Sequence, residues 1–178
     1  MGTLPSSLDH KKYVLTIQDC FSRLTVAIPL LDKAGAKIEL QRWILQFMKT
    51  TGHKVKAVRT DNGSELKNII FEKFLKTQGI IHEYSIKYEH HQDGKIDRTN
   101  QTISEMARTS LNEANLPIML WPWAYRHSVW IFNSTLHANL VKTPYETVGK
   151  RKPSLDMLRV FGSKAFLYNH NFRKDISN

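Results

Sequence analysis

The stretch that decides the fold is Lys56–Leu66, KAVRTDNGSEL, in which alternating apolar residues lead into Asp-Asn-Gly. The alternation over residues 54–60 predicts a short β-strand that ends just before Asp61. Asp-Asn-Gly is also a common turn sequence, so the acid has two interpretations. Asp61 either closes a turn, or it is one of several carboxylates that meet at one edge of a sheet and bind a metal ion.

The residues on either side of this strand predict an α/β fold. We expect an antiparallel pair of strands over 13–18 and 24–31, then a helix from Ala36 that ends at Gly52. Beyond Asp61 we expect helices over about 64–79, 95–114 and 119–133, strands over 80–85 and 158–169, and a mobile loop over 86–94. This order predicts a mixed sheet with helices on both faces.

The composition favours a polyanionic partner. Lys and Arg outnumber Asp and Glu by 26 to 16, which gives a formal net charge of +10. Nucleic acid is the first candidate partner and an anionic membrane surface the second, while simple solubility explains the charge equally well. Residues 142–178 carry eight Lys or Arg against three acids, so half of the excess lies in this basic segment.

The single cysteine and the hydropathy exclude several classes of protein. Cys20 has no partner within the chain, which rules out internal disulfides and a cysteine-based zinc site and indicates a reducing compartment. No apolar run reaches the ~18 residues that a membrane helix needs. The first residues also lack the apolar segment of a secretory signal, so we expect neither a membrane location nor secretion.

A second acid, Asp97, follows Asp61 with 35 residues between them, and we expect it in the first turn of a helix. A strand-end carboxylate and a helix-borne carboxylate can converge at one sheet edge, as in two-metal phosphoryl-transfer sites. Such sites use carboxylates because Mg²⁺ takes hard oxygen ligands. The alternatives are a turn residue at Asp61 and a helix N-terminal acid at Asp97, stabilised by the macrodipole.

Four segments together resemble the integrase core of copia-type retrotransposons. They are RTDNGSEL, GIIHEYSIKYEHHQDGKIDRTNQTISEMAR, LPIMLWPWAYRHSVWIFN and KTPYETVGKRKPSLDMLRVFG, within roughly Tyr13–Tyr168. The resemblance implies a ribonuclease-H-like fold, a three-acid site that uses Mg²⁺ or Mn²⁺, and DNA strand transfer in the nucleus, or otherwise a cytoplasmic location. It implies DNA, both element ends and target, as partner, with RNA, a second copy or a full-length integrase as further partners.

Carried over by position, the resemblance assigns Asp61 as the second acid and Asp97 as the third, both catalytic and metal-binding. The nucleic-acid contacts that it implies are Asn62, Gln92, Gly94, Lys95, Arg98, Asn100 and Gln101. It also implies a core over residues 1–140, incomplete at its N-terminus, followed by a basic segment with a β-rich portion over 141–178.

Three departures from the family pattern lead us to expect that this chain does not catalyse strand transfer alone. The strand that carries the first acid is not matched, the third acid is Asp97 where the family has Glu, and Gln101 stands where the family usually has a cation. A non-catalytic nucleic-acid-binding module is therefore an alternative. A further alternative is an assembly partner of a full-length integrase, with the aromatic residues Trp121, Trp123, Tyr125 and Trp130 as the interface, although aromatic residues at helical spacing more often belong to a core.

Overall fold

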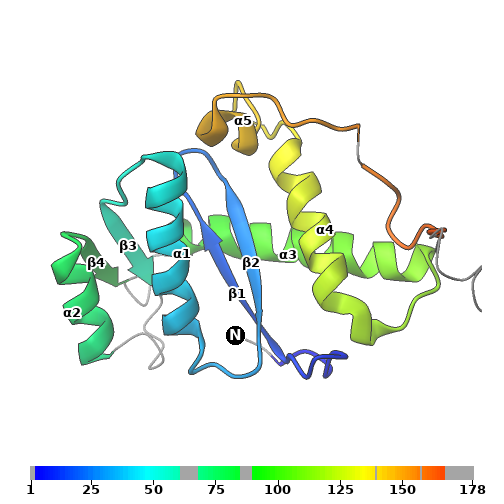
Figure 1. Ribbon diagram of the computed structural model, residues 1–178, viewed down its shortest axis with the longest axis horizontal. Coiled ribbons are helices and arrows are strands. Elements are labelled where there is room, and N and C mark those ends of the chain that lie inside the picture. The colour runs from blue at the N-terminus through cyan, green and yellow to red at the C-terminus, as the bar shows by residue number, and fades with distance from the viewer. Residues whose placement is uncertain (1–2, 61–67, 85–89, 139, 157, 167–178) are drawn as a thin grey trace, which may run out of the picture.

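The structure is a computed structural model that describes residues 3–60, 68–84, 90–138, 140–156 and 158–166 (Figure 1). In chain order the elements are β1 (Tyr13–Gln18), β2 (Thr25–Leu30), α1 (Ala36–Thr51), β3 (Ala57–Thr60), α2 (Ile69–Thr77), β4 (Ile81–Tyr84), α3 (His90–Glu113), the 3-10 helix η1 (Ile118–Leu120), α4 (Trp121–Ser134) and α5 (Pro144–Gly149). The predicted order of strands and helices up to α4 is confirmed.

The first two strands form the predicted antiparallel hairpin. β1 and β2 pair from Tyr13 opposite Leu30 to Gln18 opposite Thr25. Asp19 closes the connection between them, because its carboxylate accepts hydrogen bonds from the backbone N–H of Ser22 at 2.7 Å and from the Ser22 hydroxyl at 2.6 Å. This acid is thus a turn residue.

The remaining strands form a second pair, so the predicted mixed sheet appears as two small sheets among the described residues. β3 and β4 pair in parallel, from Ala57 opposite Ile81 to Thr60 opposite Tyr84. Among the described residues, each sheet has two strands and no hydrogen-bonded ladder joins them. Alternating apolar residues identify each strand, but they do not show which strands pair.

The helices end where the local sequence stops them. Gly52 follows α1 in the left-handed conformation, with φ 72°, and its N–H donates to the Met48 carbonyl. The side-chain oxygen of Asn68 caps α2 by accepting a hydrogen bond from the N–H of Ile70 at 2.8 Å. Pro122 lies in the first turn of α4, where its missing N–H costs nothing.

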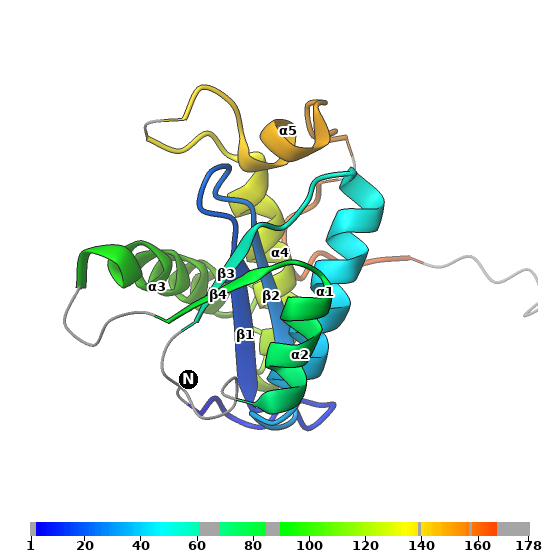
Figure 2. The same ribbon diagram turned by 90° about the vertical axis from the view of Figure 1, so that its left-hand side faces the viewer.

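Both sheets contribute to one hydrophobic core. Leu15 of β1, Ile44 of α1 and Phe71 of α2 are buried in the same cluster, and Val58 of β3 packs against it. A second cluster joins α3 and α4 through Leu111 and other apolar residues. Figure 2 shows α1 and α2 on one side of the strands and α3 on the other, and Figure 1 shows α4 on the side of the hairpin away from α1. Helices thus cover both sides of the strands, as predicted.

The edge of β1 that faces away from β2 carries no strand among the described residues. The N–H of Asp19 donates to the Leu24 carbonyl at 2.9 Å. Hydrogen-bonded pairs alternate along an antiparallel ladder, so the backbone groups of Val14, Thr16 and Gln18 point to the opposite edge. This edge is therefore open to a further strand as far as the described residues show.

The segment after α5 is irregular where it is described, so the strand predicted over 158–169 is wrong for residues 158–166; residues 167–169 lie outside the described residues. Phe161 packs against the α3–α4 core instead. Gly162, with φ 79°, lies so close to the end of α3 that an added Cβ would come within 2.5 Å of the Ala114 Cβ. This close approach favours a turn over a strand. The division at residue 140 stays a prediction.

The packing of this segment predicts a pH-dependent stability. His127 of α4 lies 5.5 Å from the Phe161 ring, centroid to centroid, and burial lowers the pKa of His127 below its ordinary value. The unfolded chain therefore binds this proton more readily, and stability falls as the pH drops through about 6.5. We expect His127→Gln to show a smaller loss of stability than the unchanged protein between about pH 7.5 and about pH 5.5 in urea unfolding.

His53→Gln is the matched control for that comparison, because His53 is exposed. The control should follow the unchanged protein across the same pH range. Equal pH dependence of all three proteins would contradict the assignment of this effect to His127.

Candidate functional site

Asp97 lies further into its helix than the sequence predicts. α3 begins at His90, so Asp97 is in the third turn, and the loop predicted over 86–94 is wrong for residues 90–94. The macrodipole interpretation of Asp97 is also wrong, because that field acts mainly within the first turn. Gly94 and the polar residues beside it concealed the helix start. Nothing lies within 4 Å of a Cβ added at Gly94, so this glycine occupies an exposed helical position.

The predicted nucleic-acid contacts on α3 share an exposed face with Asp97. Gly94, Asp97, Arg98 and Gln101 follow the i, i+3, i+4, i+7 spacing of one helix face, and all four are exposed. No described cation forms an ion pair with Asp97. The carboxylate of Asp97 is therefore accessible to a ligand from solvent.

The other predicted contacts have different positions. Lys95 is exposed on α3, and Asn100 is half-buried with its carbonyl accepting a hydrogen bond from the Ser104 hydroxyl at 2.7 Å. Gln92 lies in the first turn of α3. Asp61 and Asn62 lie outside the described residues, so the distance between the two predicted catalytic acids stays a prediction.

The end of β3, directly before Asp61, is held by a buried histidine. Thr60 is the last residue of β3, and its hydroxyl lies 2.9 Å from Nε2 of His82 on β4. The other ring nitrogen, Nδ1, lies 2.6 Å from a carboxylate oxygen of Glu72 on α2. The side chain of His82 is only 4% exposed, so these contacts fasten β3, β4 and α2 together at this point.

Tyr84 extends this network at the end of β4. Its hydroxyl donates a hydrogen bond to the same Glu72 oxygen. Hydrogen bonds from Tyr84 and then from His82 lower the pKa of the Glu72 carboxyl, and the bond to Glu72 raises the pKa of Tyr84. Glu72 is therefore ionised at neutral pH, with its charge directed to these two partners.

A second polar contact fastens α3 to the hairpin. The side-chain amide of Gln18, at the end of β1, donates hydrogen bonds of 3.0 Å to the hydroxyls of Thr25 and Thr99. Thr99 is buried on α3, two residues after Asp97. The contact fixes the rotation of α3 against the hairpin and leaves Asp97 on the exposed side of the helix.

The orientation of the elements allows the two predicted acids to share one side of the molecule. β3 and β4 are parallel, so both end on the same side, and in Figure 2 these ends point toward the side where α3 begins. Within the described residues, no group of three acidic, histidine or cysteine side chains could hold a metal ion. Of the predicted metal ligands, only Asp97 can be placed. Its exposed oxygen donors fit a hard divalent cation.

Comparison with known proteins identifies the domain. Residues 3–90 match the integrase core domain family. The chain contains an integrase core domain. It is 29% identical over 163 residues to the retrovirus-related Pol polyprotein from transposon TNT 1-94 of Nicotiana tabacum. It is 28% identical over 161 residues to the truncated transposon Ty1-A Gag-Pol polyprotein of Saccharomyces cerevisiae. These names fit the copia-type resemblance.

The alignments cover most of this integrase core chain but little of its relatives. They include 91% of the chain and 12% of the tobacco polyprotein, and 89% of the chain and 14% of the yeast one. The activities of the complete polyproteins therefore do not transfer to this chain without a test.

Solved structures show the fold. The HTLV-2 integrase catalytic core domain in complex with magnesium aligns with a TM-score of 0.60 and 21% identity, covering 83% of this chain and 99% of that one. An intasome of simian T-cell lymphotropic virus with the PP2A regulatory subunit B56 gamma aligns with a TM-score of 0.64 and 18% identity, covering 93% of this chain and 56% of that one. The predicted ribonuclease-H-like fold is confirmed.

Sequence reasoning missed the residues that support this integrase site from within. The sequence predicts only that Glu72 belongs to a helix and that His82 and Gln18 belong to strands. One feature of the sequence indicated part of this network. His82 and Tyr84 are two positions apart in a predicted strand, so their side chains lie on the same face of it. Their meeting with Glu72 depends on how α2 packs, which no spacing in the sequence reveals.

Proposed function

We propose that this integrase core uses Asp61 and Asp97 to bind Mg²⁺ or Mn²⁺ for DNA strand transfer. The match to the integrase core domain is the observation that carries the proposal. It is supported by the exposed carboxylate of Asp97, which forms no ion pair with a described cation, and by the network that holds Thr60 immediately before Asp61. A bound cation of this kind stabilises the charge that develops on the attacking and leaving oxygens.

The chain's own residues have separate roles in this proposal. Asp61 and Asp97 bind the ion, and the exposed side chains of Lys95, Arg98 and Gln101 on α3 contact the DNA backbone beside it, together with Asn62, Gln92, Gly94 and Asn100. Aspartate at position 97 reaches about 1–1.5 Å less far than glutamate, and a displacement of ~1 Å can cost about a hundredfold in rate. With aspartate at position 97, we expect this chain to bind the ion more readily than it completes strand transfer.

The setting of the activity belongs to the same proposal. DNA is the substrate, at both element ends and target, and the work is done in the nucleus with a second copy or a full-length integrase. RNA is a weaker candidate ligand for the same basic surface. Among the described residues, no helix is long and apolar enough to cross a membrane.

Manganese binding tests this proposal directly. We expect the 178-residue chain to bind Mn²⁺, and Asp61→Ala and Asp97→Ala each to weaken the affinity by more than about tenfold, because even outer partners of metal ligands contribute that much. Asp97→Glu should retain binding or strengthen it. Isothermal titration calorimetry measures the affinities, with loss of the heat signal in EDTA as the specificity check.

Glu113→Ala is the matched control, because Glu113 is an exposed acid at the other end of α3. It should leave Mn²⁺ affinity unchanged. Mn²⁺ binding that survives both Asp61→Ala and Asp97→Ala would refute the proposed metal site.

The second candidate function is nucleic-acid binding without catalysis. The observation that favours it is the number of exposed cations around α5, away from the two acids in the sequence. This function requires no metal, so binding should persist in EDTA and fall steeply with salt, because bound cations release counterions from the phosphates.

A further inference from the structure

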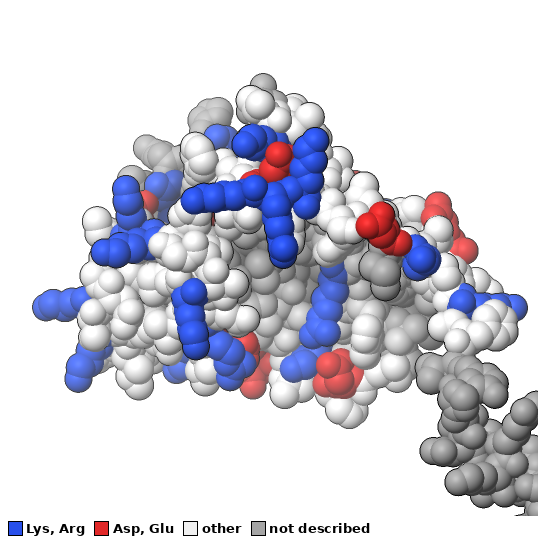
Figure 3. Space-filling model, turned by 45° about the horizontal axis from the view of Figure 1, so that its top comes forward, with Lys and Arg blue, Asp and Glu red and all other residues white. Residues whose placement is uncertain are grey.

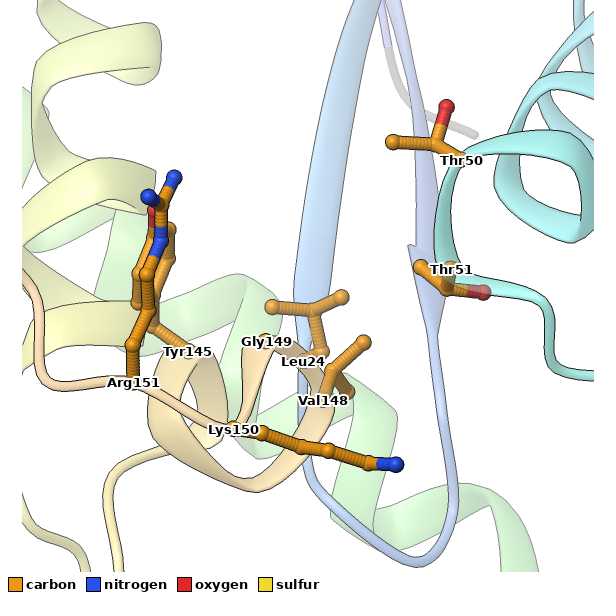
Figure 4. A pocket seen from close by; sticks show the side chains of 8 residues that line it. All are labelled: Leu24, Thr50, Thr51, Tyr145, Val148, Gly149, Lys150 and Arg151. Carbon is orange, nitrogen blue, oxygen red and sulfur yellow. The ribbon is translucent and has the colours of Figure 1, made fainter.

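A groove lies between the C-terminal end of α1 and α5, and shares no lining residue with the predicted metal site. Its volume is about 580 Å³. The polar residues that line it are Thr50, Thr51, Tyr145, Lys150 and Arg151. Figure 4 shows the Lys150 and Arg151 side chains leaving the end of α5 in different directions. Two cations and three hydroxyl groups thus surround one concave surface, which we call the α1–α5 groove.

The charge around the α1–α5 groove is almost entirely positive. Four further exposed lysines stand within three positions of a lining residue: Lys49, Lys54, Lys142 and Lys152. The only acid in residues 47–54 and 142–154 is Glu146. None of the six cations forms an ion pair with a described acid. Figure 3 shows Lys and Arg side chains gathered over the face that carries α5.

The backbone of Lys150 is strained. Lys150 follows α5 in the left-handed conformation, with φ 57°, and its N–H donates to the Glu146 carbonyl at 2.9 Å. Glycine adopts this conformation at the end of a helix at little cost, whereas lysine has a Cβ that disfavours it. The chain thus places a lysine side chain beside the groove at a position where glycine would cost less. Compensation of the dipole of α5 is a weak alternative, because α5 has only six residues.

We propose that the α1–α5 groove binds the phosphate backbone of nucleic acid, with Lys150 and Arg151 as the main contacts. This inference rests on the nucleic-acid partner of the proposed function but not on its metal site. Phosphate contacts in protein–DNA complexes come from Arg and Lys and from Ser, Thr and Tyr hydroxyls, which is the composition of this lining. A concave, hydroxyl-lined groove suits a phosphate strand better than the surface of a bilayer, which is bound by exposed apolar side chains beside the cations.

Charge reversal at the groove gives the first test. The double variant Lys150→Glu/Arg151→Glu should bind a short mixed-sequence duplex DNA at least about tenfold more weakly in fluorescence anisotropy with EDTA. The slope of log affinity against log salt should become shallower by about 2, because each lost phosphate contact removes about 0.9. The matched control is Lys73→Glu/Lys76→Glu, which reverses two exposed lysines on α2. Equal losses in the two double variants, or no loss in the first, would overturn the proposal.

The strained lysine allows a second test that separates binding from folding. Lys150→Gly relieves the left-handed backbone, so the thermal midpoint should stay the same or rise. DNA affinity should nevertheless fall. The slope of log affinity against log salt should become shallower by about 0.9, the effect of one lost phosphate contact. A purely structural role of Lys150 predicts no change in DNA binding, and that result would contradict the inference.

Two further measurements distinguish this inference from its alternatives. Asp61→Ala should retain EDTA-resistant DNA binding, so failure of the metal site leaves the groove proposal standing. DNA binding that is lost in Asp61→Ala and kept in Lys150→Glu/Arg151→Glu would overturn the groove proposal alone. Vesicles of phosphatidylserine and phosphatidylcholine test the membrane alternative, and vesicle binding that depends on Lys150 without DNA binding would replace nucleic acid as the ligand.

Discussion

Replacing Phe71 with alanine is expected to lower the free energy of unfolding by about 3–5 kcal/mol, the usual cost of removing a buried aromatic ring. Phe71 is fully buried in the core that both sheets share. Its ring also meets the His82 ring edge-on at 5.5 Å, so its removal should loosen the contact between His82 and Thr60 as well. Urea unfolding followed by tryptophan fluorescence measures the loss.

Ile70→Ala is the control for this variant. Ile70 precedes Phe71 on α2 but is 68% exposed, so its replacement should change stability by no more than about 0.5 kcal/mol. Similar losses for the two variants would mean that α2 does not present the Phe71 face to the core. The pair thus tests the orientation of the helix that supports the end of β3.

The second large effect is expected in α4. Trp121→Ala should lower the free energy of unfolding by about 3–5 kcal/mol, because Trp121 is 2% exposed in the α3–α4 core. Its indole N–H also donates to the Pro5 carbonyl at 2.9 Å, which ties the first residues to this helix. Trp121→Phe keeps most of the burial and loses that hydrogen bond, so it should fall between the alanine variant and the unchanged protein in thermal unfolding.

Trp123 provides the comparison within the same helix. It is 42% exposed, so Trp123→Ala should cost about 1 kcal/mol or less. A large loss at Trp123 and a small one at Trp121 would reverse the assignment of core and surface. α4 presents these aromatic residues differently: Trp121 is buried in the core, Tyr125 and Trp130 are half-buried, and Trp123 is exposed. The interface interpretation is therefore wrong for Trp121 and stays a prediction for the other three.

Local sequence signals predicted the elements with clear boundaries. Gly52 ends α1 and Pro122 lies in the first turn of α4 because both effects depend on the backbone of one residue. The start of α3 was predicted too late, since glycine and polar residues at 90–94 resemble a loop when their neighbours in space are unknown. The strand predicted over 158–169 failed in its described part for a similar reason, because the close approach of Gly162 to Ala114 is a tertiary contact.

The chemistry of the candidate site could be predicted from the sequence. The hydrogen bonds that hold the elements around the site could not. The spacing of Asp61 and Asp97, together with the family resemblance, identified the acids, and the integrase core match agrees with the family. The hydrogen bonds between Thr60 and His82 and from Gln18 to Thr99 join residues 22 and 81 positions apart. Such pairings depend on the fold as a whole, so no pattern within one segment could have indicated them.

The edge of β1 that carries no other strand among the described residues has a practical consequence for work with this protein. Unpaired backbone groups on an outer strand serve as a template for any other extended chain, including another molecule of the same kind. Like-charge repulsion from ten excess cations keeps molecules apart only while salt is low. Concentrated, salty solutions therefore favour molecules joining strand to strand, and dilute solutions of low ionic strength are the conditions in which single molecules can be studied.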